Sequence, residues 1–271
     1  MSSLAQYKKQ QLVKGLYLGD AGSGKTGSLV SLVEAGYKLR IYDFDNLLGS
    51  LIEQIRRVDA KLLDLVYAQT FTDKMKGVDI PLVMQGAAVK VMPFTDGTPK
   101  AFSSALKQLN HWKTETEDLG NPATWGPDCI VVIDTLTTMS AAAFRYAQAM
   151  NPAAKEPQTY YFSAQQMITN VLALLASESF ATNVLVLAHV DYSSNHLNIQ
   201  KGFPRSIGSA LNSQISAFFN CVLLAESSTG KRQIRTNSNG IVDLKNPISH
   251  KVPDTLPLET GLATFFKSLK E

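Results

Sequence analysis

The 271-residue sequence has little of what marks secreted or membrane-spanning proteins. It contains two cysteines, and no apolar run approaches the roughly 20 residues that a membrane-spanning helix requires. Cys129 and Cys221 each lie in an apolar run, which favours buried thiols in a reducing compartment over a disulfide framework. Residues 1–14 lack the apolar core of a signal peptide. These absences predict a soluble, cytoplasmic protein that does not associate with a membrane.

Charge is also scarce, at 18% of residues, and the net charge is only +3. Such a mildly basic chain has no global field that would attract nucleic acid, so any such contact must come from local clusters. The length and the 45% apolar content suffice for one substantial core. We therefore expect a single domain over residues 1–271, with residues 1–11 as an N-terminal extension.

Short β-rich apolar runs alternate with longer helix-compatible stretches, a pattern typical of an α/β fold with a mainly parallel sheet. The expected strands are 16–18, 39–44, 66–71, 130–133, 184–188, 218–226 and 232–235. The expected helices are 27–35, 47–55, 99–113, 141–150 and 160–177. Strands 218–226 and 232–235 can pair through the turn at 227–230, which predicts an antiparallel C-terminal extension.

Two stretches break this alternation. Residues 73–126 are less regular and are expected to form an insertion, with a possible hairpin at 78–91. Residues 191–205 are polar and show neither a helical nor a strand period, so they are expected to form a mobile loop.

A phosphate-binding motif lies between the first strand and the first helix. Its residues are Gly19, Asp20, Ala21, Gly22, Ser23, Gly24, Lys25 and Thr26. Glycines at this spacing let backbone amides turn towards phosphate oxygens at a helix N-terminus. Lys25 would reach the β and γ phosphates, and the Thr26 hydroxyl would bind Mg²⁺. The motif predicts binding of ATP with Mg²⁺, whereas a glycine-rich turn without a ligand is the bland alternative.

Three strand ends supply further candidates. Asp134 follows the buried strand 130–133 and is expected to assist Mg²⁺ binding. Asp43 and Asp45 flank Phe44 at the end of the second strand, and alternation would point both to one side. We favour Asp45 as the group that orients or deprotonates the attacking water. The alternative is that one or both cap a helix beginning near Asn46. His189 ends the strand 184–188, where a neutral imidazole could sense the γ-phosphate.

The order of these parts resembles the RecA-like recombinase core, and most closely the short phage-encoded RecA-like ATPases associated with single-strand annealing. Two positions depart from RecA, because Asp45 stands where the family has a glutamate and His189 where it has a glutamine. The resemblance implies a DNA-stimulated ATPase that acts on single-stranded DNA in recombination or annealing. It also implies a ring or filament with ATP at subunit interfaces, a single-strand-binding protein as a further partner, and the host cytoplasm as location.

The segment 207–224 resembles the family's stretch after its second DNA loop, which makes 191–206 the DNA-facing loop. Lys201 and Arg205 would neutralise phosphates there, and Tyr192 and Phe203 would stack on bases. For each, a solvated charge or a ring packed on the surface is the alternative. By the same resemblance a first DNA loop lies between Thr135 and Gln158, with Arg145 and Lys155 as candidates.

The segment 241–247 resembles the family strand that carries cations to the ATP of a neighbouring subunit. Lys245 matches the first cation. Pro247 occupies the place of the second, so Arg235 or Arg232 is expected to substitute for it. A helicase-like, packaging or loader motor shares every nucleotide-binding residue and stays open as an alternative, as does a regulatory protein that uses nucleotide only to lock its assembly.

Overall fold

The structure is a computed structural model that describes residues 12–74, 96–154, 156–194, 198–228 and 230–270. Its centre is an eight-stranded sheet with the order β12-β11-β10-β1-β7-β6-β2-β3. The strands of this sheet are β1 (Lys14–Gly19), β2 (Lys38–Asp43), β3 (Val66–Thr70), β6 (Cys129–Asp134), β7 (Asn183–Ala188), β10 (Cys221–Ser228), β11 (Lys231–Arg235) and β12 (Thr255–Pro257). Neighbours from β10 to β3 pair in parallel, and β11 and β12 add antiparallel pairs at one edge.

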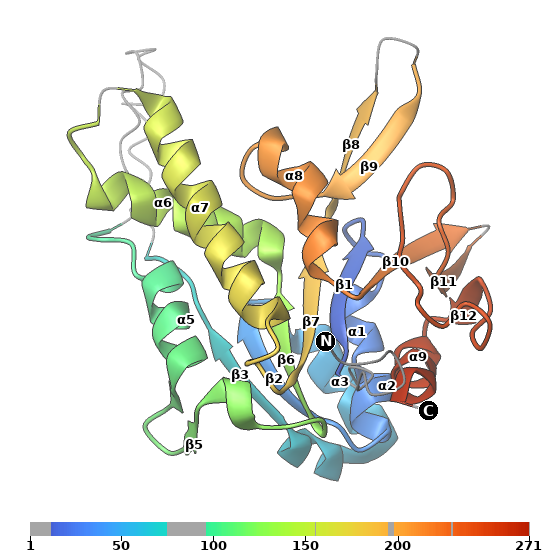
Figure 1. Cartoon of the computed structure of the whole chain (residues 1–271). Helices are drawn as coiled ribbons and strands as arrows, with labels where there is room; N and C mark the ends of the chain where they lie inside the picture. The colour runs from blue at the N-terminus through green and yellow to red at the C-terminus, as the bar shows by residue number, and fades with distance from the viewer. Residues whose placement is uncertain (1–11, 75–95, 155, 195–197, 229, 271) are drawn as a thin grey trace, which may run out of the picture.

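Helices cover both faces of the sheet (Figure 1). The helices are α1 (Lys25–Ser28), α2 (Val30–Glu34), α3 (Gly49–Asp59), α5 (Ala101–Asn110), α6 (Leu136–Met150), α7 (Pro157–Ala176), α8 (Ser209–Ile215) and α9 (Gly261–Lys270). One apolar core packs α5, α6, α7 and α8 on one face, and a second core packs α2, α3 and α9 on the other. Every residue of β1, β6 and β7 is buried, because each of these strands lies between two helical layers.

This sandwich of two helical layers around a mainly parallel sheet is the α/β fold that the sequence predicts. The antiparallel extension of β10 and β11 is confirmed, with Ser228 opposite Lys231. Cys129 and Cys221 are free and buried. The part of the chain that the structure describes contains no helix that is both long and apolar enough to span a membrane.

The prediction of an unstructured loop at 191–205 is wrong. These residues form a hairpin of β8 (Val190–Ser194) and β9 (Gln200–Pro204), which projects beyond the central sheet (Figure 1). Four successive β8 residues, from Asp191 to Ser194, are exposed. Apolar and polar residues alternate along a strand only where one face of the strand is buried. Because both faces of β8 are exposed, its sequence shows no such alternation.

Two other expectations also need correction. The segment 241–247 is not a strand, since it contributes only isolated bridges at Val242 and Lys245. Helix α6 begins at Leu136, so residues 135–158 are mostly helical and leave at most a short connection before α7. The Thr135 side chain caps α6 by accepting from the Thr138 N–H.

The region 73–126 contains α5 and a small hairpin of β4 (Trp112–Lys113) and β5 (Asp118–Gly120), and the predicted hairpin at 78–91 lies outside the described residues. A 3-10 helix (Ala60–Leu65) precedes β3, and two shorter ones cover Pro122–Thr124 and Ser216–Phe218. Helices α8 and α9 and strand β12 were not predicted from the sequence.

Candidate nucleotide site

The phosphate-binding motif occupies the turn from β1 to α1. Gly22 and Gly24 have φ angles of 75° and 93°, in the left-handed region that favours glycine. A Cβ on Gly24 would lie 2.6 Å from Leu258 Cδ2, so a larger residue there would need the Leu258 side chain to move as well as an unfavourable φ. The Ser28 N–H donates to the Gly24 carbonyl at 2.9 Å and starts the helix. The loop therefore places a helix N-terminus and its unpaired amides at the carboxyl edge of the sheet.

The Lys25 ammonium is folded back on this loop. Its Nζ donates to the carbonyl oxygens of Gly19 at 2.7 Å and Asp20 at 3.0 Å. Burial lowers the pKa of Lys25, while Asp134, Asp20 and Asp45 act in the opposite direction. The cation is thus held among carboxylates without a direct ion pair in the described chain, and it can turn towards an anionic ligand.

Thr26 and Asp134 meet where a divalent cation is expected. The Thr26 hydroxyl donates to Asp134 Oδ2 at 2.9 Å, and Asp134 Oδ1 is buried without a hydrogen-bond partner among the described residues. An orphaned carboxylate oxygen beside a hydroxyl is a donor set that fits Mg²⁺. The described residues contain no group of three or more His, Cys, Asp or Glu side chains that could hold a metal. Mg²⁺ would therefore need phosphate and water oxygens as its remaining ligands.

The buried Asp134 carboxylate destabilises the folded protein when no ligand is bound. Burial raises its pKa to about 7, with the Thr26 hydrogen bond opposing and the Asp45 charge adding to the shift. Because the folded-state pKa lies above the ordinary 3.8, the ionised form is disfavoured in the fold. This destabilisation grows as pH rises from about 4 to 7 and is complete above 7.

We therefore expect Asp134→Asn to stabilise the nucleotide-free protein at pH 8 by about 1–2 kcal/mol, since an amide keeps an acceptor for Thr26 without the buried charge. Thermal unfolding of both proteins at pH 8 and pH 5 measures this. The advantage of the variant should shrink at pH 5, and a variant less stable than wild type at pH 8 would refute the assignment of a strained carboxylate.

The two aspartates after β2 have different surroundings. Asp43 is buried, and its Oδ1 accepts from the backbone N–H groups of Asp45 and Asn46 at 3.1 and 2.7 Å. The strand ends at Asp43 and turns, so strand alternation does not relate the two side chains. Helix α3 begins at Gly49, and its N-cap Leu48 makes no side-chain cap, so neither aspartate caps it. Asp43 thus stabilises the turn that presents Asp45.

Thr135, which was not predicted from the sequence, connects Asp45 to the strand that ends at Asp134. Its hydroxyl donates to Asp45 Oδ1 at 3.3 Å. Thr135 directly follows Asp134, so the candidate metal ligand and the candidate base are held by adjacent residues. The sequence signal that could have identified Thr135 is a threonine directly after the aspartate at the end of a strand. Its hydroxyl oxygen can accept a hydrogen bond as a helix cap while its O–H donates to a neighbouring carboxylate.

His189 lies between β7 and β8, next to Gly19 of the phosphate-binding motif at residues 19–26, which we call the P-loop. Burial lowers its pKa, Lys25 lowers it further, and Asp45 and a hydrogen bond with the Gly19 backbone raise it. These contributions keep the imidazole neutral at neutral pH, as a phosphate sensor requires. The backbone N–H of His189 donates to Thr137 Oγ1 at 3.1 Å, and the Thr137 hydroxyl donates to the backbone carbonyl of Arg205 at 3.0 Å. Thr137, also missed in the sequence, therefore joins α6 to both ends of the hairpin.

The structure places the expected DNA contacts on this hairpin. Tyr192 is 43% exposed, Phe203 is half-buried on β9, and Arg205 is exposed at the hairpin base. Lys201 pairs with Asp243 at 3.2 Å. In the other expected DNA loop, Arg145 pairs with Asp73 at 2.8 Å. Lys155 lies outside the described residues.

The expected trans-acting cations make contacts within their own chain. Lys245 Nζ donates to the carbonyls of Ser216 at 2.8 Å and Phe219 at 3.2 Å. Arg235 pairs with Glu226 at 2.8 Å. Arg232 is exposed, and its Cδ lies 3.7 Å from where a Cβ of Gly24 would be. Among these three, Arg232 lies against the P-loop of its own chain, which favours contact with a nucleotide in cis.

Comparison with known proteins identifies no relative by sequence. No family model matches the chain, and no curated protein matches it. Among solved structures, an ATPase from the type III secretion system of pathogenic bacteria is similar, with a TM-score of 0.37 and 11% sequence identity. The match covers 79% of this chain and 51% of that one, so the chain spans about half the length of this neighbour.

Proposed function

We propose that this protein is a Mg²⁺-dependent ATPase. The observation that carries the proposal is the convergence of three strand ends on the P-loop: Thr26 bonded to Asp134, Asp45 held by Thr135, and His189 beside Gly19. Thr26 and Asp134 would hold Mg²⁺, which supplies charge neutralisation for the phosphates. Lys25 binds the β and γ phosphates, Asp45 orients the attacking water, and His189 senses the γ-phosphate.

We propose further that ATP controls work on single-stranded DNA, in recombination or annealing of the RecA type. The support is that the hairpin of β8 and β9 begins directly after His189 and carries Tyr192, Lys201, Phe203 and Arg205. A change at His189 reaches the hairpin through Thr137 and through the bond from the Arg205 N–H to the His189 carbonyl at 2.8 Å. The proposal extends to a phage-encoded protein that assembles as a ring or filament. In that assembly Lys245 or Arg235 would act on the ATP of the next subunit, and a single-strand-binding protein would be a further partner.

Phosphate release from ATP tests both parts together. We expect turnover with Mg²⁺, none with EDTA, and stimulation by single-stranded DNA. Lys201→Ala/Arg205→Ala should lose the stimulation, keep the basal rate, and show a DNA affinity whose log–log salt slope is shallower by about 0.7 per lost phosphate contact.

The matched control is Lys61→Ala/Lys267→Ala, which removes two exposed lysines far from the hairpin in sequence and should behave as wild type. Mg²⁺-dependent turnover that single-stranded DNA does not affect would retain the ATPase and overturn the DNA proposal. Such a result, with loss of assembly in Lys25→Ala, would favour a nucleotide-locked assembly protein.

A further inference from the structure

Asp20 places a carboxylate inside the phosphate-binding loop, which is an unfavourable position for binding an anion. Its backbone carbonyl accepts from Lys25 Nζ and from the Ser23 N–H, so the main chain of Asp20 belongs to the phosphate cradle. Its charge acts on Lys25. Two like charges about 5 Å apart repel by about 1–3 kcal/mol at dielectric constants between those of water and a protein surface. An unrestrained carboxylate here would therefore weaken the binding of a polyphosphate.

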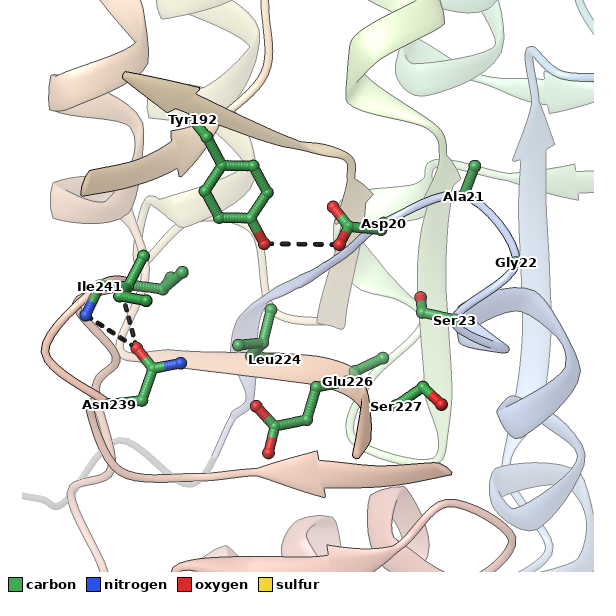
Figure 2. A pocket seen from close by; sticks show the side chains of 12 residues that line it. Asp20, Ala21, Gly22, Ser23, Tyr192, Leu224, Glu226, Ser227, Asn239 and Ile241 are labelled. Atoms are coloured by element: carbon green, nitrogen blue, oxygen red, sulfur yellow. Dashed lines mark hydrogen bonds between the residues drawn. The ribbon is translucent and has the colours of Figure 1, made fainter. Parts of the chain in front are cut away.

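The side chain of Asp20 is directed away from the cradle, towards the hairpin. Tyr192 Oη donates to Asp20 Oδ2 at 3.4 Å, and Figure 2 shows the two side chains meeting across a pocket. The pocket has a volume of about 300 Å³ and is also lined by Glu226, Ser227 and Asn239. Glu226 is already paired with Arg235, and Asn239 accepts from the Ile241 and Val242 N–H groups. Tyr192 is thus the side chain of this lining that binds Asp20.

The Tyr192 ring is held in place by the hairpin. Tyr192 pairs with Gly202 across the two strands, and a Cβ on Gly202 would lie 3.1 Å from Tyr192 Cε1. The ring therefore passes close to the Gly202 backbone, where a Cβ would also lie 2.8 Å from Val190 Cγ1 and 2.9 Å from Val242 Cγ2. The Gly202 N–H donates to the Ile241 carbonyl at 3.0 Å and anchors the hairpin to the segment beyond β11.

We propose that Tyr192 is a positioning residue for nucleotide binding, which holds the Asp20 carboxylate outward and so reduces its repulsion of the ATP phosphates. The inference rests on the proposed ATP binding at Gly19 to Thr26. It gives the hairpin a direct influence on ATP affinity, separate from the connection through Thr137 and His189. Because coupling between sites is reciprocal, a ligand that displaces Tyr192 lowers ATP affinity, and ATP strengthens the contact of the hairpin with the loop.

A double-mutant cycle in MgATP binding, measured by calorimetry, tests this positioning role. Tyr192→Phe removes the hydroxyl and keeps the ring, and should raise the Kd for MgATP about threefold, because an O–H···O hydrogen bond of 3.4 Å is long and therefore weaker than most bonds to a charged acceptor. Asp20→Asn should lower the Kd several-fold. In the Asp20→Asn background, Tyr192→Phe should have no further effect, since no charge remains to be held away. The gain in MgATP affinity from Asp20→Asn should also become smaller at high salt, because salt screens the repulsion between the Asp20 carboxylate and the phosphates.

Readouts of different kinds separate this role from a structural one. The salt dependence of the Asp20→Asn effect on the Kd is a readout that a merely structural role of Tyr192 would not change. Ser193→Ala on the same strand should leave the Kd unchanged. Equal effects of Tyr192→Phe with and without Asp20→Asn, or no effect on the Kd at all, would overturn the inference while ATP binding by the wild type stands. Absence of ATP binding by the wild type would instead refute the proposed function.

Discussion

Lys25→Ala is expected to weaken MgATP binding at least about 100-fold and to abolish turnover. The Lys25 ammonium is buried and touches the Gly19 and Asp20 carbonyls, so it stands at the centre of the loop. Removing it leaves the backbone amides and Mg²⁺ to balance the polyphosphate charge, and the loss of a charge-assisted contact in a part-buried site costs about 3 kcal/mol. Calorimetric titration with MgATP and phosphate release measure the two losses.

The control for this variant is Lys38→Ala, which removes an exposed lysine at the start of β2, at the opposite end of the strand from the site. It should bind and hydrolyse ATP as the wild type does. Because Lys25 also holds the loop carbonyls, circular dichroism and thermal unfolding should accompany the titration. A folded Lys25→Ala protein that binds MgATP with unchanged affinity would remove the P-loop from the mechanism.

Asp45→Asn is expected to reduce turnover by about 10²–10⁴-fold while MgATP affinity stays within a few-fold of wild type. The Asp45 carboxylate is half-buried and accepts from Thr135, which orients it next to the strand end that carries Asp134. An amide preserves the shape and an acceptor for Thr135, but it cannot take a proton from water. Phosphate release at saturating MgATP gives the kcat, and calorimetry gives the affinity.

Asp43→Asn is the matched control, since an amide oxygen can still accept from the Asp45 and Asn46 N–H groups that Asp43 now binds. Its turnover should fall far less than that of Asp45→Asn. A larger loss in Asp43→Asn than in Asp45→Asn would exchange the roles of the two residues, and unchanged turnover in Asp45→Asn would exclude it as the base.

Sequence patterns predicted the elements whose side chains are buried on both faces. The strands β1, β6 and β7 each contain an apolar run, and each ends at a residue of the candidate site or directly before one. The P-loop was recognisable because its chemistry depends on backbone turns that need glycine at set positions. Long-range pairing sets the position of each remaining strand in the sheet, and no local sequence pattern reveals that order.

The sequence did not reveal the contacts that connect these parts. Thr135 and Thr137 gain their roles only because α6 starts within one residue of β6 and points both hydroxyls at neighbouring strand ends. The hairpin of β8 and β9 was hidden because its first strand is exposed on both faces. The meeting of Asp20 and Tyr192 depends on where that hairpin folds, and the two residues are 172 positions apart in the chain.

Calorimetric titration of MgATP into the purified wild-type protein, with Lys25→Ala measured in parallel, tests the central claim most directly. We predict saturable binding of one nucleotide per chain in the wild type, a strong dependence on Mg²⁺, and loss of that binding in the variant. A folded wild-type protein that shows no saturable binding of MgATP, or binding that is unaffected by Lys25→Ala, would contradict it.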